Sequence, residues 1–549
     1  MPTVTFPLDY LGRLCSTSPE QLAEQAFDYG LNAALQSQDL EVEVTAERPD
    51  LLAAEGFTRA INIYNGQPRT VPITLKNSGR RVTVSPEVRE LRPYIAALVV
   101  ENISLGEAGL ASLIQFQEKV TYTFGRQRQK IAIGVYDLDQ IEGTLEYTAI
   151  PQDELNFIPL GTDQPMTGRQ ILEQHPNGVL FSRTLPQNSQ VPVLRDSHKI
   201  LSLPPIINAA GVGEVTPSTR NLFIDVTGIT QKTVLEMINI LAHNFLDTGS
   251  PVKTVTIENG NGTLVTPDLS RKPITFSARF LNEMLGTAIP KTDLGRYLSR
   301  MDLEVTGTNE ILVPSYRTDI FSEIDIAGDL MVAIGLDNLE AEPTAVRFHM
   351  GQSDPLRNFV LRIGDQSQRM GLMEVKSLVL TDPDILSWFM ADSLLTANAK
   401  SRSFSAVRST LQAGLLEILS HNISAPKPIN IYETGEVILP HPNNPDSPPH
   451  ETFYWGFASL DARASFAAAK AYVQTLLQAL KIPYDLMPCE DRRYIPGRAA
   501  TVIIQGKPAG HFGEIHPKLL SYFSFPEPIC SGELDCQQLN PDSEVSRWM

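Results

Sequence analysis

The run Leu222-Phe-Ile-Asp-Val-Thr-Gly228 decides the fold of the middle of this chain. Its apolar residues predict a buried strand, and it leads into an amphipathic helix that Thr230 caps and Gly249 ends. A second strand over residues 252–257 meets the turn Glu258-Asn-Gly-Asn-Gly262, whose residues accept positive φ and favour a hairpin. A strand, a helix and a hairpin in this order predict a mixed α/β domain.

Outward from this stretch the chain divides into four predicted domains, because 549 residues exceed what one core holds. Residues 1–88 form an N-terminal α+β domain and residues 89–266 the mixed α/β domain. Residues 267–343 hold two helices and a small strand pair, which indicates a winged-helix-like module. Residues 344–549 alternate helices with strands of an antiparallel sheet. The predicted fold class is therefore α+β and multidomain, with strands of the second domain expected at residues 95–100, 130–135, 179–181 and 222–226.

Composition places limits on function. The net charge is −18, with 63 acidic against 45 basic residues, so bulk electrostatics do not favour binding to nucleic acid. Any contact with RNA needs a local patch or a more basic partner. No apolar run is long enough to cross a membrane, and the start of the chain lacks a secretory pattern. Four sparse cysteines without CxxC spacing indicate reduced thiols and a cytoplasmic location.

Common catalytic signatures are missing from the sequence. It holds no GxxxxGK[ST] phosphate loop, no GxSxG elbow and no HExxH motif. The residues alone therefore give no argument for an ATP site in this chain.

Asp225 and Thr227 stand two residues apart on the predicted strand and so share one of its faces. With the nearby run Ser202-Leu-Pro-Pro-Ile-Ile-Asn208, they offer a carboxylate and hydroxyls around a pocket. Such groups position a water or select a hydroxylated ligand, because buried polar groups penalise an unmatched partner. The simpler alternative is a capping or turn network at the end of a strand.

An acidic cluster follows Arg317, with Asp319, Glu323, Asp325 and Asp329 inside eleven residues. Magnesium needs several converging oxygen ligands, and helical spacing can bring these side chains near one another. The alternative is a solvated helix N-terminus, which the helix macrodipole favours.

Two further groups have simple explanations. The basic run Arg126-Gln-Arg128-Gln-Lys130 is able to contact phosphate, although a solvated approach to a strand is the commoner case. His511 and His516 are five apart and do not share a helix face, which favours a strand and turn over metal ligation.

Taken together and in order, these motifs resemble the beta subunit of phenylalanyl-tRNA synthetase of the archaeal and eukaryotic kind. The resemblance runs almost from end to end of the chain, and each motif is weak alone while their collinear order is specific. The segments that carry it include Glu47-Arg-Pro-Asp-Leu-Leu-Ala-Ala-Glu-Gly56, Ala132-Ile-Gly-Val-Tyr-Asp-Leu-Asp139, Ser202-Leu-Pro-Pro-Ile-Ile-Asn208, Phe223-Ile-Asp-Val-Thr-Gly228, Val313-Pro-Ser-Tyr-Arg-Thr-Asp-Ile320, Tyr432-Glu-Thr-Gly-Glu436 and Gly513-Glu-Ile-His-Pro517.

The resemblance implies a division of labour. The family's alpha subunit uses ATP to activate phenylalanine and charges tRNA(Phe), in an alpha2beta2 tetramer. The beta subunit carries a B1-like domain, a B3/B4-like editing domain, a B5-like domain and an inactive catalytic-core-like domain that pairs with alpha. The editing domain hydrolyses mischarged Tyr-tRNA(Phe).

The family's site residues carry over to particular positions. The editing serine, aspartate and threonine correspond to Ser202, Asp225 and Thr227. Three of the four B5 magnesium (Mg2+) ligands correspond to Asp319, Asp325 and Asp329, and the fourth, a glutamate, is replaced by Gly328.

Two departures keep other functions open. Glu47 replaces the family's asparagine, and Tyr136 stands where histidine is frequent. The alternatives are a stand-alone paralogue that edits in trans or binds aminoacyl groups without an alpha partner, and a structural adaptor with an inactive pocket.

Overall fold

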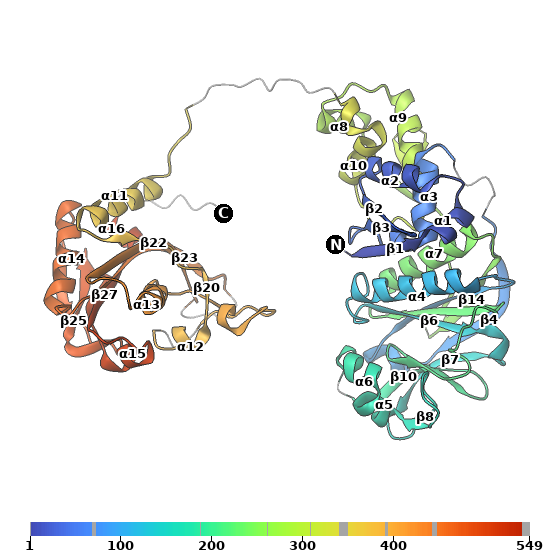
Figure 1. Cartoon of the computed structure of the whole chain (residues 1–549), viewed down its shortest axis with the longest axis horizontal. Coiled ribbons are helices and arrows are strands. Elements are labelled where there is room, and N and C mark those ends of the chain that lie inside the picture. The colour runs from blue at the N-terminus through green and yellow to red at the C-terminus, as the bar shows by residue number, and fades with distance from the viewer. Residues whose placement is uncertain are drawn as a thin grey trace. The chain divides into compact units, whose positions relative to one another are not determined.

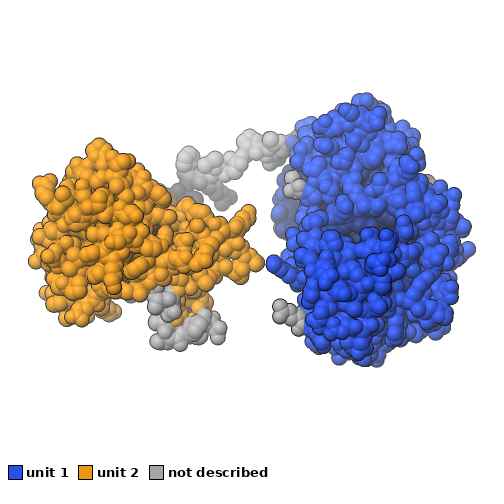
Figure 2. All heavy atoms as spheres, turned by 60° about the horizontal axis from the view of Figure 1, so that its bottom comes forward, with its two compact units in different colours: residues 1–343 blue, residues 344–549 orange. Residues whose placement is uncertain are grey.

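The computed structural model describes residues 2–67, 73–186, 188–260, 262–307, 309–339, 350–389, 393–441 and 447–540. The chain forms two compact units, residues 1–343 and residues 344–549 (Figure 2). No helix within the described residues is long and apolar enough to span a membrane. The cytoplasmic location and the four-domain division stay predictions.

The first unit begins with a small antiparallel sheet in the order β1-β3-β2. Alternate residues of the central strand, Leu40 and Val42, are fully buried, as the alternating sequence pattern requires. Helices pack beside this sheet, and Ser18 caps the second of them by accepting from the Gln21 N–H. The elements are β1 (Thr3–Pro7), α1 (Leu8–Leu14), α2 (Pro19–Asp28), β2 (Asn32–Gln36), β3 (Asp39–Glu43), η1 (Pro49–Leu52) and α3 (Ala54–Tyr64).

A sheet of ten described strands forms the middle of the first unit (Figure 1). The strands β4 and β14 pair in parallel, as do β4 and β7, and the other pairs are antiparallel. In spatial order they are β12 (Ile207–Asn208), β11 (Ile200–Leu203), β10 (Gln190–Arg195), β7 (Leu145–Pro151), β4 (Lys76–Val84), β14 (Val252–Asn259), β5 (Tyr94–Val100), β13 (Leu222–Gly228) and β6 (Ile131–Asp137), with β15 (Gly262–Thr266) paired to β14.

The two faces of strand β13 have different neighbours. Ile224 and Val226 join the apolar core formed with helices α4 (Gly106–Tyr122) and α7 (Gln231–Asp247). Phe223 points the other way, into a second core within the sheet, and Asp225 and Thr227 share its face. The predicted strand, helix and hairpin of this region are confirmed.

One predicted strand of this domain is wrong. Residues 179–181 belong to helix α6 (Pro176–Phe181), which Pro176 opens and which the His175 side chain caps by accepting from the Asn177 N–H. The local helix start therefore overrides the short apolar run. Other short elements here are η2 (Pro86–Glu90), η3 (Leu138–Gln140), β8 (Asn156–Phe157), β9 (Met166–Thr167), α5 (Gly168–Gln174) and η4 (Ser182–Thr184).

The last part of the first unit packs three helices on a small sheet of order β16-β18-β17. Leu281, Leu294 and Leu330, one from each helix, are fully buried in the core that also receives α3 and α7. The elements are β16 (Lys272–Thr275), α8 (Ala278–Leu285), α9 (Lys291–Leu298), η5 (Ser299–Met301), β17 (Glu304–Thr306), β18 (Glu310–Val313), α10 (Glu323–Ile334) and η6 (Leu336–Asn338).

The second unit is built on a sheet of order β19-β22-β23-β27-β26-β25-β24, antiparallel except for the pair β19 and β22. Two separate apolar cores contact it, one with α11 and α14 and one with α12, α13 and α15. The α+β fold class is confirmed. The elements are α11 (Pro355–Arg369), β19 (Met373–Glu374), β20 (Leu380–Thr381), α12 (Pro383–Leu386), η7 (Arg402–Phe404), β21 (Ala406–Val407), α13 (Gln412–His421), β22 (Ile429–Leu439), β23 (His450–Leu460), α14 (Phe466–Ala479), β24 (Asp485–Pro488), β25 (Tyr494–Ile504), β26 (Lys507–Ile515), α15 (Pro517–Tyr522), β27 (Ile529–Asp535) and α16 (Cys536–Leu539).

Candidate functional site

The large sheet of the first unit curls until its two end strands come together. The Tyr136 hydroxyl on β6 donates to Ser202 Oγ on β11 at 2.8 Å. The Asn208 side-chain amide on β12 donates to the Val135 carbonyl on β6 at 3.1 Å. Between these strands lies a cavity of about 590 Å³, a size typical of small-molecule sites.

The predicted trio lines this cavity. Ser202, Asp225 and Thr227 are all among its lining residues, and each is at most 1 % exposed. Asp225 lies opposite Gly134 in the β13–β6 register. A β-carbon at Gly134 would overlap Asp225 Oδ1 and the Tyr136 hydroxyl, so only glycine leaves room for both oxygens.

Asp225 is the unusual member. Its Oδ1 is buried and has no hydrogen-bond partner among the described residues. Burial raises the pKa of Asp225 to about 7, against the lowering effects of the Tyr136 hydroxyl and the Arg92 charge. An unpaired buried carboxylate oxygen is costly, so it marks a place where a ligand completes the hydrogen bonding.

A buried arginine, Arg92, holds the Thr227 end of strand β13 in place. Arg92 is fully buried; its Nε donates to Thr227 Oγ1 at 3.0 Å and its Nη2 to the Thr227 carbonyl at 2.8 Å. Burial lowers the pKa of Arg92 to about 10. The Tyr147 hydroxyl in turn donates to the Arg92 carbonyl at 2.8 Å. Thr227 is thus oriented by a cation whose side-chain hydrogen bonds go to Thr227 and to backbone carbonyls.

The chemistry available here is binding and water orientation. Among the described residues that line the cavity there is no histidine or cysteine, so neither a Ser–His pair nor a cysteine nucleophile is formed there. The Asp225 carboxylate is able to accept a hydrogen bond from a ligand hydroxyl or from a water.

Comparison with known proteins places the chain. It is 31% identical to the phenylalanine--tRNA ligase beta subunit of Pyrococcus abyssi over 89% of both chains, and 31% identical to that of Methanospirillum hungatei over the full length of both. The chain belongs to the phenylalanine--tRNA ligase beta subunit family. Residues 339–536 match the family model of the phenylalanyl tRNA synthetase beta chain CLM domain, and residues 274–336 match the tRNA synthetase B5 domain.

A solved structure agrees with this membership. The N-terminal fragment of the phenylalanyl-tRNA synthetase beta subunit from Pyrococcus horikoshii covers 60% of this chain and 99% of its own length. It superposes with a TM-score of 0.58 at 30% sequence identity. The fold of the first unit of this beta-subunit family member is therefore shared with that fragment.

Sequence reasoning missed three residues of the pocket. Tyr136 was noted only as a departure from the family, Gly134 only within a motif, and Arg92 had no assigned role. The available signal was the alternation on β6, which puts Gly134 and Tyr136 on one face. The contact between β6 and β11 depends on the curl of the sheet, which no local pattern reveals.

The predicted magnesium ligands lie in a different arrangement. The Arg317 guanidinium donates to both oxygens of Asp319, at 2.9 and 2.7 Å, and lies 2.8 Å from Asp329 Oδ2. Asp325 instead closes a capping box with Ser322, and its Oδ2 also accepts from the Phe321 N–H at 2.8 Å. Glu323 accepts from the Ser277 N–H at 2.9 Å.

This arrangement does not fit a magnesium shell. Arg317 is bonded to two of the three carboxylates, and the third is turned to a helix terminus. Across the part of the chain that the structure describes, no group of three or more acidic, histidine or cysteine side chains gathers as a metal site requires. The magnesium ligands stay a prediction from the resemblance, and no step of the chemistry is derived through them.

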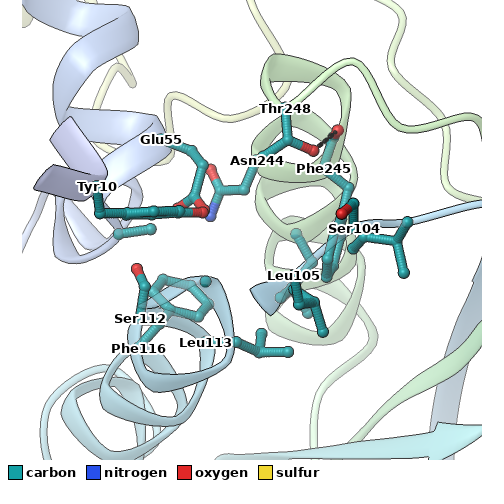
Figure 3. Close-up of a pocket in the computed structure, with 14 residues that line it drawn as sticks. Tyr10, Glu55, Ser104, Leu105, Ser112, Leu113, Phe116, Asn244, Phe245 and Thr248 are labelled. Atoms are coloured by element: carbon teal, nitrogen blue, oxygen red, sulfur yellow. Dashed lines mark hydrogen bonds between the residues drawn. The ribbon is translucent and has the colours of Figure 1, made fainter. Parts of the chain in front are cut away.

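A second, much smaller cavity of about 40 Å³ lies among α1, α3, α4 and α7 (Figure 3). Its acidic side chain, Glu55, already accepts the Tyr10 hydroxyl at 2.5 Å, and Thr248 donates to the Phe245 carbonyl at 2.7 Å. Burial raises the pKa of Glu55. Its carboxylate thus has a partner within the protein and its volume is small, so the Asp225 cavity is the better candidate.

Proposed function

We propose that this chain is the beta subunit of a phenylalanine--tRNA ligase and that its Asp225 pocket hydrolyses mischarged Tyr-tRNA(Phe). The observation that carries the editing proposal is the unpaired, buried Asp225 Oδ1 inside a cavity of ligand size. Support for the ligase comes from relatives that match most or all of the chain.

Asp225 selects by reading the phenolic hydroxyl. A tyrosyl group offers an O–H that donates to Asp225 Oδ1, whereas a phenylalanyl group leaves this oxygen unpaired. A site that hydrogen-bonds a substrate hydroxyl rejects the analogue that lacks it by a large factor. Phe-tRNA(Phe), the correct product, is thereby spared.

The hydrolytic step needs no covalent intermediate. A water oxygen attacks the ester carbonyl carbon that joins tyrosine to the tRNA ribose. The ester C–O bond to the ribose oxygen then breaks, and a proton from the water passes to that oxygen. The products are tyrosine and uncharged tRNA. Ser202 and Thr227 supply hydroxyl groups beside the reacting ester, and burial within the cavity limits other water.

The names of the relatives also suggest the partners. A beta subunit works with an alpha subunit, which we propose binds ATP and charges tRNA(Phe) within an alpha2beta2 tetramer. No observation favours the stand-alone paralogue. The mass of the purified assembly separates the two, because a lone chain would contradict the tetramer.

The editing proposal is tested with Asp225→Ala in the holoenzyme. We expect the rate of Tyr-tRNA(Phe) hydrolysis to fall about 100-fold or more, because an unmatched hydroxyl carries such penalties. Phenylalanine charging by alpha should not change. Asp153→Ala, at an exposed ion pair with Arg169, is the matched control and should leave both activities intact. Unchanged hydrolysis in Asp225→Ala would contradict the assignment.

A further inference from the structure

Two short segments far apart in the sequence share the pattern of an arginine two residues before an aspartate. They are Arg48-Pro-Asp50, at the start of η1, and Arg317-Thr-Asp319, between β18 and α10. In the first, Arg48 Nε and Nη2 donate to the two Asp50 oxygens at 2.9 and 2.8 Å. In the second, Arg317 forms the same two-bond pair with Asp319 at 2.9 and 2.7 Å. Each segment thus closes a bidentate ion pair on itself.

The two ion pairs lie against each other inside the first unit. Arg48 Nε is 3.9 Å from Asp319 Oδ1, so an arginine of the N-terminal part of the chain contacts an aspartate of the B5 domain. Arg48, Asp50 and Arg317 are 8 %, 0 % and 6 % exposed. Buried charges are screened little by solvent, so this contact joins two parts of the chain that are distant in sequence.

Further contacts fasten the same two parts together. Arg300 of the B5 domain donates from Nε to the Tyr64 carbonyl at the end of α3, at 2.9 Å, and its guanidinium lies 4.0 Å from the centre of the Tyr64 ring. The Tyr64 hydroxyl donates to the Val332 carbonyl on α10 at 3.3 Å. Arg59 of α3 lies 4.1 Å from the centre of the Tyr316 ring. Arginines from both sides therefore stack on rings across one boundary.

A guanidinium lies where the family's magnesium ligands would converge. Asp319 and Asp329 both face Arg317, which donates to Asp329 Oδ1 at 3.0 Å and lies 2.8 Å from its Oδ2. Asp325 faces the first turn of α10 instead. A β-carbon at Gly328 would meet no atom within 4 Å, so no other side chain takes the place of the missing glutamate. Arg317 would lie beside any magnesium ion that Asp319 and Asp329 bound, and the two positive charges would repel.

We propose that Arg48, Asp50, Arg317, Asp319 and Asp329 form a metal-independent clasp between the N-terminal part of the chain and the B5 domain. The Arg317 guanidinium performs the task that the resemblance assigns to magnesium, because it draws Asp319 and Asp329 together. Arg48 extends the ion pairing to a segment outside the B5 domain. Arginine suits this role, since it is always charged and its planar group bonds carboxylates in pairs. The inference does not depend on the editing proposal.

Hydrogen exchange of the full-length chain tests the clasp. The readout is the exchange rate of amides in α10, which belongs to the B5 domain, with α7 as the internal reference. We expect Arg48→Met to raise exchange in α10 about 10-fold or more, because removing one partner of a buried ion pair is strongly destabilising. Exchange in α7 should stay as in wild type. EDTA should leave α10 unchanged in wild type, and millimolar magnesium should not restore the variant.

Matched variants separate the clasp from general damage. Arg13→Met removes an arginine of the same N-terminal part whose pair with Asp9 is exposed, and it should leave α10 unchanged. Asp319→Asn should raise exchange in α3, because a clasp acts on both parts that it joins. Arg48→Lys keeps the charge but loses the two-bond geometry, so it should raise α10 exchange less than Arg48→Met. It gives the same reading if the methionine variant unfolds.

Three results would overturn the proposal. The first is unchanged α10 exchange in Arg48→Met, and the second is an equal rise in Arg13→Met. The third is a rise of α10 exchange in wild type on adding EDTA that magnesium reverses, because a metal would then hold the domain.

Discussion

Two buried sites in the first unit combine aspartate with arginine, and they differ in how completely the carboxylates are paired. At Arg317, the guanidinium bonds both oxygens of Asp319 and lies 2.8 Å from Asp329. Near Asp225, the buried Arg92 directs its side-chain hydrogen bonds to Thr227 and to backbone carbonyls. All four oxygens of Asp319 and Asp329 lie within 3.0 Å of the Arg317 guanidinium, although Asp329 Oδ2 has only the ion-pair contact and no hydrogen bond. Asp225 Oδ1 has neither an ion-pair contact with Arg92 nor a hydrogen bond from it.

The difference separates a structural cluster from a binding site. At the first site the Arg317 guanidinium contacts every oxygen of Asp319 and Asp329, which leaves no carboxylate oxygen clear of the cation for a metal. A buried carboxylate with an unpaired oxygen beside a cavity is unstable unless something binds it. Residue type alone therefore does not indicate function, and an unsatisfied carboxylate oxygen beside a ligand-sized cavity is the stronger sign.

Asp319 and Asp225 respond to pH in opposite directions. Hydrogen bonds from Arg317 lower the pKa of Asp319 below its usual range in spite of burial. This stabilisation is present above the ordinary pKa of the unfolded carboxyl and is lost as pH falls through the lowered folded value. Burial raises the pKa of Asp225, so its unfavourable effect on stability appears as pH rises.

The largest expected effect is on the stability of the cluster around Arg317. Arg317→Met keeps most of the volume but removes the cation that contacts Asp319 and Asp329, which leaves only Arg48, whose Nε lies 3.9 Å from Asp319 Oδ1. We expect the free energy of unfolding to fall by about 3–5 kcal/mol, the usual result of breaking a buried pair. Urea unfolding followed by circular dichroism measures it, and a loss below about 1 kcal/mol would show that the cluster is solvated.

At Asp225 the pH dependence of stability has the opposite sign from that at Asp319. Between about pH 4 and pH 7 the folded chain holds a proton on Asp225 that the unfolded chain has released. Stability therefore falls with rising pH, by about 1.4 kcal/mol per unit, and levels off above pH 7. Asp225→Asn lacks this titration, so its urea midpoint should improve relative to wild type from pH 5 to pH 7. A difference that stays flat would mean that Asp225 is not buried as a carboxyl.

Tyr136→Phe tests how the two ends of the sheet meet at the pocket. The variant loses the hydrogen bond to Ser202 Oγ, at a cost of about 1 kcal/mol. Because the hydroxyl lowers the pKa of Asp225 while Arg92 is unchanged, the pH midpoint of deacylation should move upward. Tyr147→Phe loses a hydrogen bond to the Arg92 carbonyl and should leave that midpoint in place.

The smallest effect concerns the predicted magnesium. Asp325→Ala removes the capping box at α10 and should cost about 1 kcal/mol. Metal analysis of the intact protein should find no stoichiometric magnesium, and EDTA should leave the unfolding temperature unchanged. Magnesium bound one to one, and lost in Asp325→Ala, would show that the family's ligand positions bind magnesium here in spite of the Arg317 ion pairs.

Sequence and structure agree where the pattern is local. The alternation on β13 puts Asp225 and Thr227 on one face, and the family resemblance assigns Ser202, on a distant strand, to the same pocket. Helical spacing does not apply to the whole acidic cluster, because α10 begins at Glu323 and Asp319 precedes it. Tyr136 and Arg92 reach the pocket through the curl of the sheet, so no spacing rule identifies them.

We propose that Asp225 Oδ1 accepts a hydrogen bond from the hydroxyl of a tyrosyl group and that this contact selects the substrate. The most direct test compares holoenzyme deacylation of Tyr-tRNA(Phe) and Phe-tRNA(Phe) in wild type and in Asp225→Ala. We predict that wild type prefers the tyrosyl substrate by about 100-fold or more in kcat/KM, and that the preference nearly disappears in the variant. A preference that survives in Asp225→Ala would contradict the claim.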